Sequence, residues 1–137
     1  MARQDFQTEK NDVIYSDIFI NLNVHPGNNQ LARHTNENAV RRAIKNLVLT
    51  DEDERLCQPD VYCSIKKALF EPMGPVIADT IKTLITEVIE NHERRARLID
   101  VLVRPDYEQN LYTVTIIFAM INIPEPISMN ITLNRVR

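Results

Sequence analysis

The spacing of apolar side chains changes from a helical to a strand period near residue 92. Over 75–91, a helical stripe is formed by Ile77, Ile81, Leu84, Ile85, Val88 and Ile89. Beyond it, apolar residues alternate with others over 98–104, 111–121 and 127–135. Helices followed by strands favour an α+β fold, with helices packed on one face of a largely antiparallel sheet and a C-terminal β-hairpin that extends it.

The first part of the chain predicts one strand and two further helices. Alternation from Ile18 to Val24 indicates a strand over 17–24. A helix is expected to begin after Thr35 or Asn36 and to end near Leu49, because acidic residues follow. A short helix over 63–70 precedes the long one, which Pro75 would open. These elements predict a flexible segment, 1–16, and a single domain over 17–137.

The strand over 111–121 is apolar on both faces, and such strands are normally covered on both sides by the domain or by a partner. In the preceding strand, Ile99, Val101 and Val103 are expected on one face. Pro124-Glu125-Pro126 predicts the turn into the last strand. The terminal hairpin would leave an exposed edge, so we expect recognition by strand addition, and self-association of the isolated protein.

Composition narrows the class of function without naming it. The 137 residues are 44% hydrophobic and carry a formal net charge of −3, which argues against nucleic-acid binding. A membrane span or secretory signal is not expected, because no long apolar run is present. Two glycines cannot build a phosphate-binding loop, and Cys57, Cys63 and three scattered histidines form no metal motif. We therefore expect no cofactor and no metal.

Several short segments, in order, resemble the baseplate wedge, or sheath-initiator, subunits of contractile phage tails. This "lysozyme-like" baseplate family also occurs in type VI secretion systems. The resemblance covers about residues 15–137 and rests on Tyr15-Ser16-Asp17-Ile18, Val40-Arg41-Arg42-Ala43-Ile44-Lys45-Asn46-Leu47, Leu69-Phe70-Glu71-Pro72, Ala78-Asp79-Thr80 and Glu93-Arg94-Arg95. Arg94 stands where the family typically has Pro, and Asp53-Glu54-Arg55-Leu56 keeps only the Arg of a Gly-x-Arg-Pro-like stretch.

The resemblance implies a structural role in the virion, after synthesis in the host cytoplasm. Six copies would surround the tail tube, and Glu93 and Arg95 would contact the helical core bundle of other wedge proteins. The strands within 111–135 would pair with the first ring of tail sheath protein. The residues of this pairing are Tyr112, Val114, Ile116, Phe118, Met129, Ile131 and Leu133.

Each of these interpretations has an alternative. Glu93 and Arg95 lie in a charge run that a helix end could simply expose to solvent; two positions apart, they more readily occupy a turn than one helical face. The C-terminal strands could form a self-contained sheet or a homodimer. A basic patch for an acidic partner, or merely two polar helix faces, could be formed by Arg41, Arg42, Lys66 and Lys67.

The alternative function is glycan cleavage, which requires two carboxylates at a defined separation. Asp79, Glu87 and Glu90 fall on the polar side of the long helix, where carboxylates are normally solvated. Trp, a common platform for sugars, is absent. We therefore expect no enzymatic activity.

Overall fold

The computed structural model describes residues 13–121 and 123–135. The chain divides after Ala39 into two compact units. Helix α1 (Asn36–Leu49) begins at the end of the first unit and continues into the second. None of the helices among the described residues is long and apolar enough to cross a membrane.

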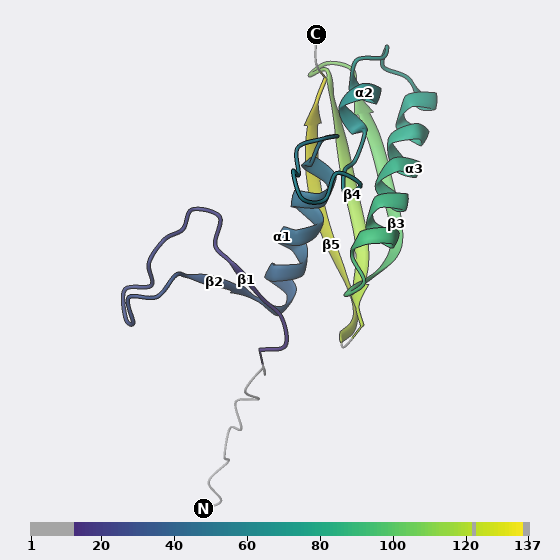
Figure 1. Ribbon diagram of the computed structural model, residues 1–137. Coiled ribbons are helices and arrows are strands. Elements are labelled where there is room, and N and C mark those ends of the chain that lie inside the picture. The colour runs from purple at the N-terminus through teal and green to yellow at the C-terminus, as the bar shows by residue number, and fades with distance from the viewer. Residues whose placement is uncertain (1–12, 122, 136–137) are drawn as a thin grey trace, which may run out of the picture. The chain divides into compact units, whose positions relative to one another are not determined.

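The second unit has the expected α+β architecture. Its sheet contains β3 (Ala96–Asp106), β4 (Leu111–Met120) and β5 (Ile123–Asn134), antiparallel and in that order, so the C-terminal hairpin extends the sheet. Helix α1, the short α2 (Ile65–Leu69) and the long α3 (Pro75–His92) lie along this sheet (Figure 1).

The core lies between the helices and one face of the sheet. Every second side chain of β4 is buried on this face, and Val114, Ile116 and Phe118 are fully enclosed. Helix α3 contributes Ile81 and Ile85 to the same core, each fully buried. Burying one such side chain stabilises the fold by about 1.5–3 kcal/mol. The opposite face carries polar side chains, among them Thr113, Thr115, Asn130 and Thr132, beside apolar ones such as Leu102 and Ile117, all half-buried or exposed.

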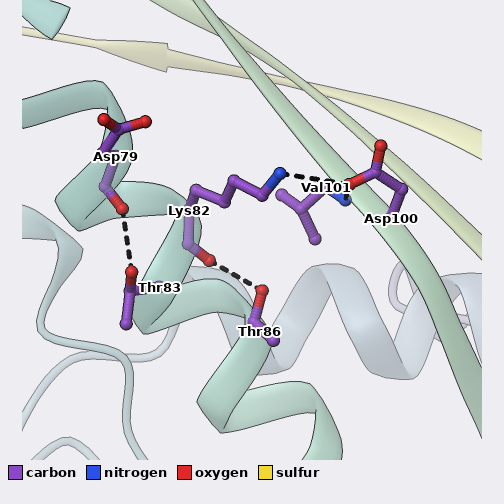
Figure 2. Close-up of polar contacts among 6 residues, drawn as sticks. All are labelled: Asp79, Lys82, Thr83, Thr86, Asp100 and Val101. Carbon is purple, nitrogen blue, oxygen red and sulfur yellow. Dashed lines mark hydrogen bonds and ion pairs between the residues drawn. The ribbon is translucent and has the colours of Figure 1, made fainter.

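Helix α3 begins at Pro75, as the sequence predicts, with Gly74 before it in an extended conformation. Figure 2 shows how its polar side is organised. Thr83 and Thr86 donate hydrogen bonds to the carbonyls of Asp79 and Lys82 one turn earlier, at 3.0 and 2.9 Å. Lys82 reaches across to Asp100 of β3 at 3.2 Å and lowers the pKa of that carboxyl group by donating a hydrogen bond to it.

An irregularity in β3 changes which side chains are buried. The register between β3 and β4 shifts between Leu98 and Asp100, as in a β-bulge. Val101 is buried and Val103 half-buried, as expected, but Ile99 is 55% exposed. The extra residue inverts the alternation, so the prediction for Ile99 is wrong.

The proline-rich segment is part of a strand and not the turn. β4 ends at Met120 and β5 begins at Ile123, so Pro124 and Pro126 both lie in β5. Ala119 pairs with Pro126 whereas Met120 pairs with Ile123, which leaves two residues of β5 bulged between these pairs. β5 is an edge strand, and edges and bulges tolerate residues that lack an N–H.

The first unit contains less regular structure than the sequence predicts. β1 (Ser16–Ile18) ends early and pairs with β2 (Arg33–Thr35), which was not expected. Beyond these strands, the pairing continues irregularly through a Phe19–Ala32 main-chain hydrogen bond of 2.9 Å and a bridge between Val24 and Leu31. Leu22 has a φ of 51° and its N–H donates to the Phe19 carbonyl at 2.9 Å, so a turn interrupts the strand predicted over 17–24.

Candidate functional site

Glu93 lies at the end of helix α3, where its own N–H donates to the Ile89 carbonyl at 2.9 Å. With 6% of its surface exposed, it is the one charged residue that is buried among the described residues. Burying a carboxylate is costly unless it is paired and hydrogen-bonded. The arrangement around Glu93 therefore has to supply a cation close by.

Arg95 is that cation. Its Nε and Nη2 atoms each lie 2.7 Å from one oxygen of Glu93, and its main-chain N–H donates to Oε1 at 3.2 Å. A planar guanidinium that contacts both oxygens of a carboxylate forms a strong, directional pair. The sequence predicted that these residues lie in a turn. In the structure their side chains pair with each other instead of both facing outward.

The two members of the pair differ in exposure. The Arg95 side chain is 35% exposed and that of Glu93 only 7%. Glu93 therefore orients the guanidinium, and Arg95 is the more exposed member of the pair. Its neighbour Arg94 is exposed.

A groove of about 660 Å³, lined by both polar and apolar groups, adjoins this turn. The Ile121 N–H donates to the Arg95 carbonyl at 3.1 Å, which joins the turn to the end of β4. Ile99 and Ile121 line the groove and are 55% and 67% exposed. Sequence alternation missed Ile99 because the bulge in β3 is what turns it outward. The groove and Arg95 together form the surface that we call the α3–β3 turn surface.

The β4 residues expected to pair with sheath have inward-facing side chains. Tyr112, Val114, Ile116 and Phe118 are fully buried in the core. The main chain of β4 pairs with β3 on one side and with β5 on the other. In this fold β4 therefore has no edge to offer, and any strand addition at the hairpin falls to β5.

The remaining predicted residues lie on β5, where Met129, Ile131 and Leu133 also point into the core, 8%, 3% and 4% exposed. What β5 presents outward is its main chain. In an antiparallel pair, successive residues turn their N–H and C=O groups to alternate sides. Pro105 of β3 pairs with Tyr112 of β4, and proline has no N–H to donate. We therefore assign Pro105 and Tyr112 as a non-hydrogen-bonded pair of the antiparallel ladder.

Tyr112 then turns its main-chain groups toward Leu133, its partner on β5. The alternate β5 residues turn theirs to the outer edge: Ser128, Asn130, Thr132 and Asn134. One further contact agrees with this direction, because Arg41 of α1 donates from Nη1 to the Ser128 carbonyl at 2.7 Å. The outer edge of β5 is thus occupied at Ser128 by a side chain of the same protein.

The basic residues considered for a patch are engaged within the protein or partly buried. Lys66 and Lys67 form ion pairs with Asp51 and Glu52, and these carboxylates raise the pKa of both lysines by accepting hydrogen bonds. The Nε atom of Arg42 is buried. These contacts favour polar helix faces over an acidic-partner site.

The acidic residues considered for catalysis lie on an open helix surface. Asp79, Glu87 and Glu90 are all exposed on α3. A glycosidase acid needs an environment that keeps it protonated, such as an apolar pocket. Among the described residues, no group of three or more His, Cys, Asp or Glu side chains could hold a metal ion.

Comparison with known proteins identifies the class. The family model of baseplate wedge protein gp25 matches residues 34–125. The baseplate wedge protein gp25 of Enterobacteria phage T4 is 28% identical over 114 residues, which cover 83% of this chain and 86% of that protein. Because the family model covers more than half of the sequence, this chain belongs to the phage baseplate wedge protein gp25 family.

Two solved structures share the fold. A putative tail lysozyme from Geobacter sulfurreducens has a TM-score of 0.67 at 17% identity, covering 72% of this chain and 89% of its own. A chain of the anti-feeding prophage baseplate has a TM-score of 0.63 at 18% identity, covering 90% and 87%. At these identities the likeness concerns the fold, and the resemblance inferred from the short motifs is confirmed by the family match.

Proposed function

We propose that this wedge protein is a non-enzymatic adaptor in the baseplate of a contractile tail. One end docks on the helical core bundle of other wedge proteins, and the other starts sheath assembly by strand pairing. Six copies surround the tail tube and meet the first ring of sheath, without nucleic acid, membrane or cofactor. The protein is made in the host cytoplasm and ends in the tail of the virion.

The observation that carries this proposal is the outer edge of β5. An edge strand presents main-chain groups that a strand from another protein can pair with. Main-chain pairing tolerates variation in side chains and transmits a defined strand direction, which suits a template for assembly. The α3–β3 turn surface supports the second contact, since Arg95 is aimed by Glu93 next to exposed apolar residues.

The sheath contact is tested at Asn130. Proline at this position removes one outward N–H, a change that an edge strand can accommodate, whereas threonine keeps it. We expect tagged Asn130→Pro chain, recovered from assembling tails, to retain wedge proteins and lose sheath, and Asn130→Thr to retain both. Deletion of β5 is unsuitable, because the strand supplies Met129, Ile131 and Leu133 to the core.

The wedge contact is tested with two neighbouring arginines. Arg95→Ala should lose the wedge proteins, whereas Arg94→Ala, which changes an exposed side chain of equal charge, should retain them. If both variants bind wedge proteins like the unchanged chain, the docking proposal fails. If the purified protein clears peptidoglycan, glycan cleavage replaces the structural role.

A further inference from the structure

A pocket of about 180 Å³ lies at the C-terminal end of β5. Three consecutive residues of the strand line it: Thr132, Leu133 and Asn134. Thr132 and Asn134 are exposed on the open face of the sheet, whereas Leu133 is buried on the helix face. Since three consecutive residues of β5 line one pocket, and β4 occupies the inner side of β5, the pocket lies against the outer edge of β5.

The other walls come from the helices and are largely apolar. Val48 lies near the end of α1, Ile65 and Leu69 belong to α2, and Cys63 precedes α2. The charged groups that touch the pocket, Asp51 and Lys66, form an ion pair with each other. An apolar occupant therefore fits the pocket better than a charged one, which would have to break that pair.

The position of the pocket along the strand matches the open part of the edge. Arg41 occupies the outward carbonyl of Ser128, so the next outward main-chain groups are those of Asn130, Thr132 and Asn134. A strand that pairs with this half of β5 passes directly over the pocket.

We propose that the strand that pairs with β5 places one large apolar side chain in this pocket. The inference rests on the proposed function and deepens it, because main-chain bonds hold the strand whereas the pocket selects its sequence and register. An apolar cavity of about 150 Å³ can hold a ring the size of benzene, so the present volume suits Leu, Ile, Met or Phe. Arg41 marks the opposite limit of the pairing.

The first test fills the pocket from inside. In Cys63→Met the longer side chain occupies part of the space, whereas Cys57→Met makes the same substitution at an exposed cysteine outside the pocket. Thermal melting checks that both variants fold. Binding of the purified full-length variants to the tail sheath subunit of the same phage is then measured. We expect Cys63→Met to weaken binding about 10- to 100-fold, the range expected when one large side chain is not buried. Cys57→Met should bind like the unchanged chain, because Cys57 does not line the pocket.

The second test changes the partner. Synthetic peptides covering the extended terminal segments of the sheath subunit are titrated against the full-length chain, with each large apolar residue replaced by alanine in turn. One position should carry a loss of 10-fold or more, and only that position should lose its effect in Cys63→Met. Equal effects at every position would contradict the proposal that one side chain occupies the pocket.

Asn130→Pro separates the two proposals. If Asn130→Pro abolishes sheath binding and Cys63→Met does not change it, the edge is used and the pocket is not. If neither variant changes binding, the proposal of strand pairing at β5 is wrong, and the proposal for the pocket is wrong as well.

Discussion

The two units of this protein use apolar residues in opposite ways. In the second unit, the helices and the sheet enclose Ile44, Ile85 and Phe118 completely. In the described part of the first unit, Phe19 is half-buried, but most large apolar side chains remain about half exposed or more: Val13, Ile14, Ile18, Ile20, Leu22, Val24 and Leu31. Alternation of apolar residues thus predicts a stable strand only when another element covers the apolar face.

Different interactions hold the two units. The first depends on polar contacts, such as Asn36 Oδ1, which accepts hydrogen bonds from the N–H groups of Ile14 and Tyr15 at 2.9 and 3.2 Å. The stacked rings of Phe19 and His34 lie 4.1 Å apart. The second unit depends on its buried core and on the Glu93–Arg95 ion pair at the end of α3.

The largest effect should come from the same truncation made in both units. Ile116 is fully buried and Ile20 is 58% exposed. Ile116→Ala should lower the free energy of unfolding by about 2–5 kcal/mol, because it removes buried methyl groups and leaves a cavity. Ile20→Ala should change it by no more than about 0.5 kcal/mol. Chemical denaturation measures both, and equal losses would contradict the contrast between the units.

A smaller loss of unfolding free energy is expected when the Glu93–Arg95 ion pair of the second unit is broken. Glu93→Gln removes the carboxylate charge opposite Arg95 and should cost roughly 1–3 kcal/mol. Glu90→Gln changes an exposed carboxylate on the same helix and serves as the control. Denaturant midpoints that coincide for the two variants would show that the buried pair adds no stability.

In the first unit, the corresponding change should be local. Asn36→Ala removes the acceptor for the Ile14 and Tyr15 amides, whereas Asn36→Asp keeps one. With alanine, these amides should exchange with solvent about tenfold faster, while the melting temperature of the second unit stays the same. A fall in that temperature would mean that the first unit stabilises the second.

The smallest effect on stability is expected from modification of an exposed thiol. Cys57 is exposed, whereas Cys63 is buried and its burial raises the pKa of the thiol to about 11. An alkylating reagent at pH 8 should therefore modify Cys57 alone and leave the melting temperature unchanged. Mass spectrometry counts the adducts, and rapid addition of two would show that the core opens around Cys63.

The same burial gives a dependence on alkaline pH. The folded protein holds the Cys63 proton more tightly than the unfolded chain does, so this stabilisation is complete below pH 9. It is lost as the pH rises from 9 toward 11. Cys63→Ala should lack this part of the alkaline destabilisation.

Patterns that one element satisfies by itself were predictable from the sequence. The spacing of apolar residues and Pro75 located α3, and the strand periods located β3, β4 and β5. The direct pairing of Glu93 with Arg95 was not predictable, since a turn leaves open whether its side chains face each other or a partner. The exposure of Ile99 depends on a bulge, which a regular period of two cannot reveal.

The turn predicted at Pro124 and Pro126 was wrong for a related reason. Proline is common in turns, but it is also accepted at an edge strand, and which strand is at the edge is a property of the whole sheet. Positive φ at Leu22 likewise depends on the local turn and gives no signal in the side-chain pattern.

The contact between Arg41 and Ser128 also bears on the period between synthesis and assembly. An unassembled subunit with a fully open edge would pair with its own copies and be lost to aggregates. A guanidinium on one carbonyl shortens the run of edge that such copies can use, and it is part of a stable helix, so it costs the chain no additional segment. One arginine thus makes self-pairing of the isolated protein through β5 less favourable than a fully open edge would.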